Sequence, residues 1–199
     1  MDYGIAENAE NAAALEKARS GDRDAFRVLV ERHAIAVFRL AYRMTMNETD
    51  AEDMVQETFL RAWREIGRFD GRASFGTWLH RICANRTVDF LRSRNRWQEA
   101  NAIGNTDQEH DPFRNMSAPT PSPERAARSA QASAMLVPAL KGLTEIERSA
   151  FVMRHYEGLG IDEVASALGV QPGAARHSIF RAVRKLRRAL EALGGTSQL

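Results

Sequence analysis

Four acidic side chains lie within nine positions of residues 49–60, TDAEDMVQETFL, in a chain whose sequence pI is about 9.0. Carboxylates at this density could coordinate a metal ion or dock on a basic partner protein. All of them would come from one helix, and no His or Asp cluster accompanies them in the sequence. This arrangement disfavours a metal site.

The apolar residues of this stretch share one helix face at about 100° per residue, and most of the acids share the other face with Leu60. Carboxylates in a first helical turn are favoured by the helix dipole. The dipole accounts for Asp50, Glu52 and Asp53, but it leaves Glu57 and the leucine unexplained. Acids around an exposed apolar residue are typical of a protein-docking surface. A simple solvated face is the alternative.

A loop and then a basic helix with aromatic residues follow, with the sequence GRFDGRASFGTWLHRICANRTVDFLRSRNRW over residues 67–97. The glycines and Asp70 indicate the loop, and Ser74 can cap the next helix. Arginines supply cations for phosphate and aromatic rings supply faces for bases, so the segment suits single-stranded nucleic acid. The alternative is that Phe75 and Trp78 belong to the core, which we favour for Trp78.

Residues 161–190, IDEVASALGVQPGAARHSIFRAVRKLRRAL, have helix-turn-helix form. Gly169 suits a left-handed turn and Pro172 suits the first position of the second helix. Six Lys or Arg and no acid occur between residues 173 and 190. Because a solvated face usually mixes charges of both signs, this pattern favours a phosphate-facing surface. The first turn of the second helix would reach base edges through Ala174, His177 and Ser178.

Capping signals and hydrophobic periodicity predict that helices position these residues. Asp22 is a candidate N-cap for a helix of about six turns. Thr49 and Glu52 form a T-x-x-E capping box, which predicts a helix from Asp50. A second box is formed by Thr144 and Glu147. No alternating strand pattern is present, so the chain is predicted to be all-α.

The composition indicates a soluble intracellular protein of two helical domains joined by a flexible linker. The 199 residues carry a net charge of +2 and one cysteine, so no intramolecular disulfide can form. No apolar run is long enough to span a bilayer. Four of the six prolines fall near or within the predicted linker. The predicted divisions are a polar extension over 1–21, a helical domain over 22–98, the linker over 99–123 and a helix-turn-helix domain over 124–199.

Two segments carry a resemblance to a known family. DAEDMVQETFLRAW, followed by FDGRASFGTWLHRICANRTVDFLR, resembles the promoter-melting domain of the extracytoplasmic-function (ECF) sigma factors of bacterial RNA polymerase. The segment from LTEIERSAFVMRHYEGLGIDEVASALGV to FRAVRKLRRAL resembles their second DNA-binding domain, and the match covers residues 22–192. The resemblance implies a cytoplasmic initiation factor that is not an enzyme and needs no metal or cofactor. It implies three partners: core RNA polymerase (β′ clamp helices and β flap), promoter DNA and an anti-sigma factor.

The resemblance also assigns roles by position. In the family, the acidic helix docks on the β′ clamp helices, which here implies Asp50, Asp53, Gln56, Glu57 and Leu60. The loop and the following helix capture the melted minus-ten element, which implies Arg68, Phe69, Arg72, Ser74, Phe75, Asn85 and Arg86. The second helix of the helix-turn-helix reads the minus-thirty-five element as duplex, which implies Ala174, Arg176, His177, Ser178, Arg181, Arg184, Lys185 and Arg188.

The chain departs from the family pattern at the start of this second helix. Where G-T-V-K-S-R-L is frequent, the sequence here is GAARHSI, so Ala174, His177 and Ser178 replace Thr, Ser and Arg. Gly160 stands where a serine cap is frequent. A common DNA contact is therefore missing, and the promoter motif preferred by this chain is not expected to be the usual one.

Two other functions are compatible with parts of the pattern. A helix-turn-helix regulator that does not act as a polymerase subunit would share the basic helix, but it has no use for the acidic face with its leucine. A metal-dependent nuclease could use Asp50, Asp53 and Glu57, but the chain lacks a convergent set of acid, base and nucleophile. Binding to polymerase and metal content separate these alternatives.

Overall fold

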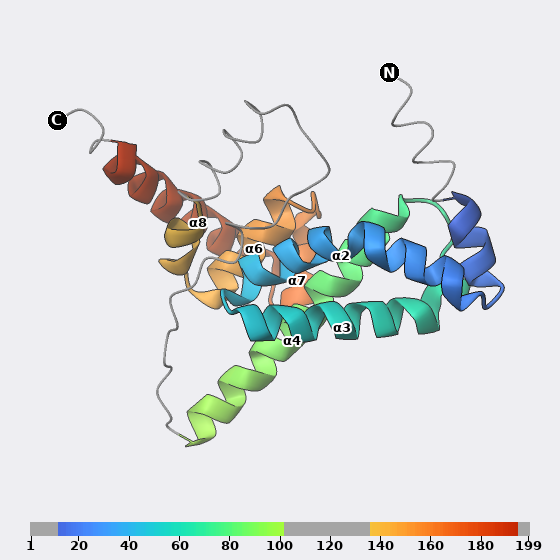
Figure 1. Ribbon diagram of the computed structural model, residues 1–199. Helices are drawn as coiled ribbons and strands as arrows, with labels where there is room; N and C mark the ends of the chain where they lie inside the picture. Colours follow the sequence, from blue (N-terminus) through green and yellow to red (C-terminus); the bar gives the residue numbers. More distant parts are fainter. Residues whose placement is uncertain (1–11, 102–135, 195–199) are drawn as a thin grey trace.

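The computed structural model describes residues 12–101 and 136–194, and these two stretches contain helices and turns but no strand (Figure 1). The all-α prediction is confirmed. Residues 12–19 and 136–141 are also helical. The remaining elements are α2 (Arg23–Thr45), α3 (Glu48–Glu65), the 3-10 helix η1 (Ile66–Arg68), α4 (Phe75–Asn101), α6 (Glu145–His155), α7 (Ile161–Leu168) and α8 (Pro172–Gly194).

The start of α2 is as predicted, but that of α3 is not. The Asp22 carboxylate accepts hydrogen bonds from the backbone N–H groups of Asp24 and Ala25 at 2.9 and 3.0 Å. The predicted capping box at Thr49 is wrong, because Asn47 is the N-cap and accepts from Asp50 N at 2.9 Å. Met46 ends α2 in a left-handed conformation (φ 57°). Only Met46 and Asn47 therefore lie between the two helices, and the amide side chain of Asn47 is a strong N-cap.

The predicted N-terminal extension and linker differ partly from the structure. Residues 12–19 form a helix whose Ala18 is buried, with Ala14 and Leu15 packed against the same core. The reason is the apolar spacing of these three residues, which places them on one face. At the other end, α4 continues to Asn101, past the boundary predicted at residue 98. Residues 102–135 of the predicted linker and C-terminal domain lie outside the described residues.

The helices α2, α3 and α4 pack on one another around a core that includes Leu29, Leu40 and Met44. Cys83 of α4 is fully buried in this core. Burial raises the pKa of its thiol to about 12, although hydrogen bonds with Thr58 and Thr87 act in the opposite direction. A thiol in this environment is protonated at neutral pH and inert.

We therefore expect Cys83 in the folded protein to react with a thiol reagent such as DTNB at pH 8 roughly a hundredfold more slowly than in guanidinium chloride. The chain has one cysteine, so the signal is unambiguous. The measurement is the absorbance of released thionitrobenzoate with and without denaturant. Equal rates under the two conditions would contradict the buried position.

The C-terminal helices form the predicted helix-turn-helix. The Thr144 and Glu147 capping box at the start of α6 is confirmed, with side-chain bonds in both directions. Gly169 has φ 54° and ends α7, and Pro172 begins α8. A left-handed residue at this point lets the chain turn sharply between the two helices.

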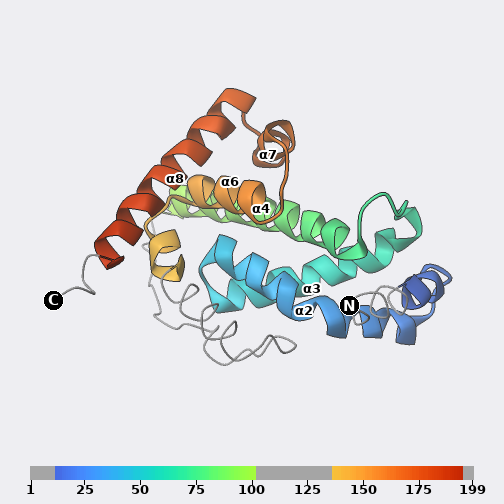
Figure 2. The same ribbon diagram turned by 90° about the horizontal axis from the view of Figure 1, so that it is seen from above.

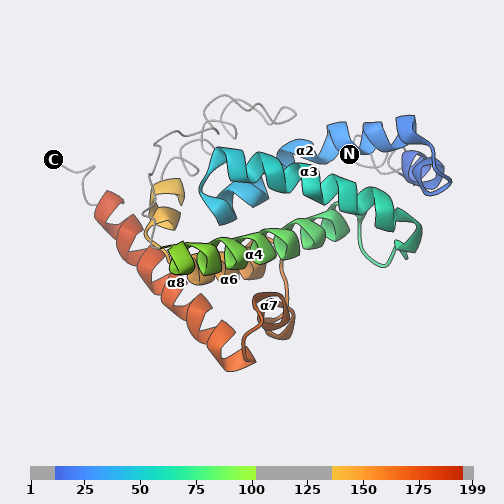
Figure 3. The ribbon, with the colours of Figure 1, turned by 90° about the horizontal axis from the view of Figure 1, so that it is seen from below.

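The two described stretches pack together. Helix α6 contacts α2 and α4, and α7 also contacts α4. Figure 2 and Figure 3, from opposite sides, both show α6 running along α4. The core around Leu29 and Leu79 continues into Val152 and Val164 of the C-terminal stretch. No helix within the described residues is long and apolar enough to cross a bilayer.

Candidate protein and nucleic-acid interfaces

The acidic face of α3 is divided between exposed and internally paired residues. Asp53 and Gln56 are exposed, and Leu60 is 57% exposed although it is a large apolar residue. The opposite side of α3 packs into the core through residues that include Ala51, Met54, Phe59 and Ala62. The structure therefore places three of the five predicted docking residues on an open surface.

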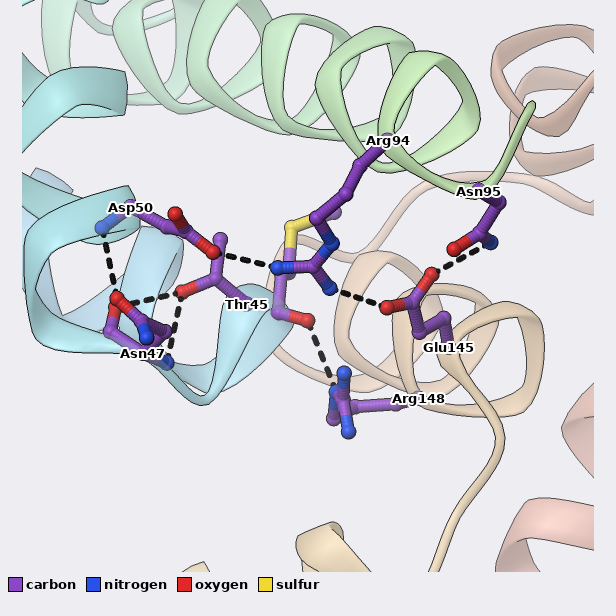
Figure 4. Close-up of polar contacts among 8 residues, drawn as sticks. Thr45, Asn47, Asp50, Arg94, Asn95, Glu145 and Arg148 are labelled. Carbon is purple, nitrogen blue, oxygen red and sulfur yellow. Dashed lines mark hydrogen bonds and ion pairs between the residues drawn. The ribbon is translucent and has the colours of Figure 1, made fainter. Parts of the chain in front are cut away.

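The other two predicted docking residues are tied to arginines of α4. Asp50 accepts a hydrogen bond from Arg94 at 2.5 Å, and Glu57 accepts one from Arg86 Nε at 3.0 Å (Figure 4 shows the first pair). Partial burial raises the pKa of Asp50, although the charge of Arg94 opposes this shift. Arg86 was predicted to contact the minus-ten element, and Glu57 was predicted to dock on polymerase. Their hydrogen bond therefore links the predicted DNA surface to the predicted docking surface, which the sequence did not show.

The loop between α3 and α4 is held in place by its own side chains. Asp70 Oδ1 accepts from Arg72 N at 3.1 Å, and Gly71 takes a left-handed conformation with φ 74°. Ser74 Oγ accepts from Thr77 N at 3.1 Å, which confirms it as the cap of α4. These local hydrogen bonds fix the backbone turns of the loop.

Of the residues predicted to capture the minus-ten element, the polar ones are accessible and the aromatic ones are not. Arg68, Arg72, Ser74 and Asn85 are exposed. Phe69 and Phe75 are buried, with exposed fractions of 5% and 7%. Neither ring offers a free face for base stacking in this arrangement, so that part of the prediction is corrected.

The two phenylalanines belong to an aromatic cluster beneath the loop. Their ring centroids lie 6.0 Å apart in an edge-to-face arrangement. Trp78 is 5.3 Å from Phe69 and 5.6 Å from Phe75, and His33 is 5.4 Å from Phe75. Aromatic pairs with these separations are mutually stabilising. The cluster thus anchors the loop to α2 and α4, which is the core alternative considered from the sequence.

Helix α8 presents most of the predicted duplex-reading residues to solvent. Seven of the eight predicted residues are exposed: Ala174, Arg176, His177, Arg181, Arg184, Lys185 and Arg188. Ser178 is the exception at 3% exposed. It lies three residues from Ala175 and four from Ala182, so it falls on the inner face of the helix. The prediction that Ser178 reaches base edges is therefore corrected.

An exposed aromatic residue on α8 was missed from the sequence. Phe180 is 65% exposed, the largest exposed fraction among the large hydrophobic residues described as exposed. It lies three residues after His177 and four before Arg184, so the three share one helix face. The same periodicity that located the arginines could have identified Phe180 as an outward-facing residue.

The cations of α8 are not equivalent, because an acid of α6 pairs with some of them. Glu147 is almost buried and lies 2.7 Å from Lys185 Nζ and 3.5 Å from Arg181 Nε. Burial alone would raise the pKa of Glu147, but hydrogen bonds from Lys185 and Thr144 outweigh it and lower the pKa. Within the described residues, four other cations of α8 have no ion-pair partner and are free for phosphate: Arg176, Arg184, Arg187 and Arg188.

The acids of α3 do not form a metal site in the described part of the chain. Across residues 12–101 and 136–194, no group of three or more His, Cys, Asp or Glu side chains is placed to hold a metal ion. The structure instead separates an acidic face with an exposed leucine on α3 from a basic face with an exposed phenylalanine on α8.

Comparisons with known proteins match both parts of the chain. Residues 29–97 match the family model of sigma-70 region 2, and residues 134–186 match that of sigma-70 region 4. The RNA polymerase sigma-H factor of Pseudomonas aeruginosa is 31% identical over 179 residues, which cover 90% of this chain and 93% of that protein. The ECF sigma factor SigE of Mycolicibacterium smegmatis is 36% identical over 159 residues, or 80% of this chain and 59% of the relative.

A solved structure agrees with these matches. CnrH, in complex with the cytosolic domain of CnrY, is 30% identical with a TM-score of 0.53, over 92% of this chain and 98% of that one. The fold and the two matched regions define a sigma-70-type transcription factor. More particularly, the chain belongs to the ECF sigma factors. It is an alternative sigma factor that binds RNA polymerase.

Proposed function

We propose that α3 docks this sigma factor on the β′ clamp helices, that α8 reads the minus-thirty-five element as duplex, and that the loop before α4 captures melted minus-ten bases. The observation that carries this proposal is the separation of charge. The exposed face of α8 has cations and no acid from residue 173 to 190, whereas Leu60 on α3 is exposed among acids. The first face suits a duplex and the second suits a basic protein.

The partners and the setting follow from this role. An anti-sigma factor would hold the protein inactive, and the β flap of polymerase would contact the C-terminal domain. The protein would act in the cytoplasm, and it would not itself catalyse a reaction. CnrH, a relative whose structure is solved, is in complex with the cytosolic domain of CnrY, which supports a protein partner of this type.

The test is transcription in vitro from a promoter selected with the purified protein and core polymerase. We expect core enzyme to initiate at that promoter only when the protein is added. A helix-turn-helix regulator that is no polymerase subunit would bind the DNA but would neither co-purify with core enzyme nor start transcription. That result would overturn the proposal.

If the loop before α4 captures melted minus-ten bases, the Arg72→Ala variant should be defective in promoter melting. The Arg72 side chain is 90% exposed, and its Nε lies 3.2 Å from Asp70 Oδ2. An exposed guanidinium group of this kind can bind a DNA phosphate or a base edge. We expect open-complex formation to fall about tenfold, since a charge-assisted hydrogen bond typically has that effect. Permanganate footprinting of unpaired thymines measures it, and promoter DNA melted in advance should restore activity.

Arg27→Ala is the matched control, because Arg27 is an exposed arginine on α2 with a 70% exposed side chain. It should form open complexes like the wild-type protein. If Arg72→Ala behaved like Arg27→Ala, or if melted DNA left its defect unchanged, the loop would not be the site of base capture.

If α8 reads the minus-thirty-five element as duplex, two substitutions on this helix should have different effects on DNA binding. His177→Ser should change the preferred base at one or two positions, with each mismatch costing about 1–3 kcal/mol. Arg184→Ala should weaken all sequences alike and reduce the salt slope of binding by about one, as expected for loss of a phosphate contact. Selection from a randomised upstream element measures both. An unchanged motif for His177→Ser with a shifted motif for Arg184→Ala would mean that α8 is rotated in the groove.

A further inference from the structure

Glu147 is a buried acid of α6 that lies against the DNA-reading helix α8. Its side chain is only 4% exposed, and glutamate is seldom buried to this extent unless it is paired. Helix α6 packs on α8, and both carboxylate oxygens of Glu147 face cations of that helix. Oε2 lies 2.7 Å from Lys185 Nζ, and Oε1 lies 3.5 Å from Arg181 Nε. These two cations are one helical turn apart, so a single carboxylate reaches both.

The start of α6 fixes this carboxylate in place. Thr144 N donates to Glu147 Oε2 at 3.1 Å, and Glu147 N donates to Thr144 Oγ1 at 3.3 Å. The first turn of a helix also favours a negative charge. Burial opposes ionisation, but the bonds with Lys185 and Thr144 lower the pKa of Glu147, so it is charged at neutral pH. The carboxylate is therefore a fixed negative charge against one side of α8.

This charge makes Lys185 a poor phosphate ligand, although its side chain is 44% exposed. Lys185 could neutralise a phosphate only by leaving Glu147, and the buried carboxylate would then lack its ammonium partner. An uncompensated buried charge of this kind is strongly destabilising. Four other cations of α8 have no ion-pair partner in the described part of the chain: Arg176, Arg184, Arg187 and Arg188.

The number of free cations governs how strongly a protein binds DNA of any sequence. Each phosphate neutralised adds about 0.9 to the salt slope of binding, whatever the bases are. Base contacts come instead from the start of the reading helix, and they fix its register at the preferred site. On other DNA the helix is free to bring any available cation to a phosphate. A withheld cation therefore weakens sequence-independent binding more than specific binding, which raises the specificity ratio.

We propose that Glu147 is a specificity-determining positioning residue, which holds Lys185 and Arg181 away from DNA phosphate and so limits binding to duplexes that lack the promoter element. This inference rests on the proposed function of α8 as the reader of that element. Glu147 is itself too buried to touch DNA. It acts through the two cations, so the helix that packs behind the reading helix sets the strength of its phosphate contacts.

The test is the Glu147→Gln variant of the full chain. Glutamine keeps the shape of the side chain and is accepted at this position of a capping box, but it removes the charge. Fluorescence anisotropy measures binding to two duplexes of equal length at several salt concentrations. One duplex carries the selected upstream element and the other a scrambled sequence. At about 0.1 M salt we expect the Kd for the scrambled duplex to fall about fivefold, with a salt slope steeper by about one. The Kd for the promoter duplex should change less than about twofold.

Two further variants separate the local effect of Glu147 from a change in net charge. Glu31→Gln removes the same charge from an exposed acid of α2 whose partner, Arg27, is on the same helix. It should leave both duplexes bound as by the wild type. Adding Lys185→Gln to Glu147→Gln should return the salt slope to its wild-type value, because Lys185 is the cation that the first substitution releases.

Three results would each overturn the proposal: an unchanged salt slope in Glu147→Gln, an equal gain in affinity for both duplexes, or a steeper slope that persists in the double variant. Loss of structure cannot imitate the expected result, because loosening α8 from α6 would weaken DNA binding, and circular dichroism verifies the fold. Failure of the wild-type chain to prefer the promoter duplex would instead overturn the proposed function of α8, which keeps the two conclusions separate.

Discussion

The Leu60→Arg variant is expected to bind core RNA polymerase roughly a hundredfold more weakly than the wild-type chain. Leu60 is 57% exposed on the acidic face of α3, so the substitution leaves the core intact. Against a basic partner, the new cation would be a like charge that has lost its water, and such mispairing costs several kcal/mol. Asp53→Arg should weaken binding in the same direction, because Asp53 is exposed beside it.

The measurement is equilibrium binding to core polymerase at fixed ionic strength, followed at two salt concentrations. Glu31→Arg is the control, since it makes the same reversal of charge as Asp53→Arg on an exposed position of α2. It should bind like the wild type, and all variants should have the same helical content. Wild-type affinity in both α3 variants would show that this face does not dock.

The Phe75→Ala variant is expected to have a free energy of unfolding about 3–5 kcal/mol below that of the wild type, as is typical for a buried phenylalanine. Phe75 is 7% exposed and contacts Phe69, Trp78 and His33 within the aromatic cluster. Removing the ring opens a cavity where the loop meets α2 and α4. Chemical denaturation measures the change, with guanidinium midpoint and slope fitted together.

Phe180→Ala provides the comparison, because Phe180 is 65% exposed on α8. Its stability should change by no more than about 0.5 kcal/mol. A stable Phe75→Ala protein that failed only in promoter melting would contradict the buried position. It would indicate that the Phe75 ring turns outward to stack on a base, as the family resemblance first implied.

Local signals in the sequence were sufficient for the helix-turn-helix. Gly169 permits a left-handed backbone because it has no Cβ, and the ring of Pro172 fixes φ at a helical value. The turn and the start of α8 were therefore predicted correctly. The capping box at Thr144 is local in the same way. The box at Thr49 failed because Asn47 competes for the same role two residues earlier, and the left-handed Met46 decided between them.

Periodicity predicted which faces are buried, but not which polar groups pair. The spacing of Ala51, Phe59 and Ala62 correctly placed the inner face of α3. The periodicity did not predict that Asp50 pairs with Arg94, which lies 44 residues away in the chain. It also did not predict that Glu147 pairs with Lys185. Ion pairs of this kind depend on how helices cross, and many crossings are compatible with one hydrophobic pattern.

The sequence alone therefore determined the class of fold, the helix-turn-helix and the acidic and basic segments, because each follows from residues close together in the chain. The tertiary structure alone decided that Phe69, Phe75 and Ser178 are buried and that Phe180 is exposed. It also decided that α6 packs on α2 and α4 through Glu145 and Arg148. The physical reason is that burial and long-range pairing depend on which surfaces meet, whereas helix formation and capping depend on neighbouring residues.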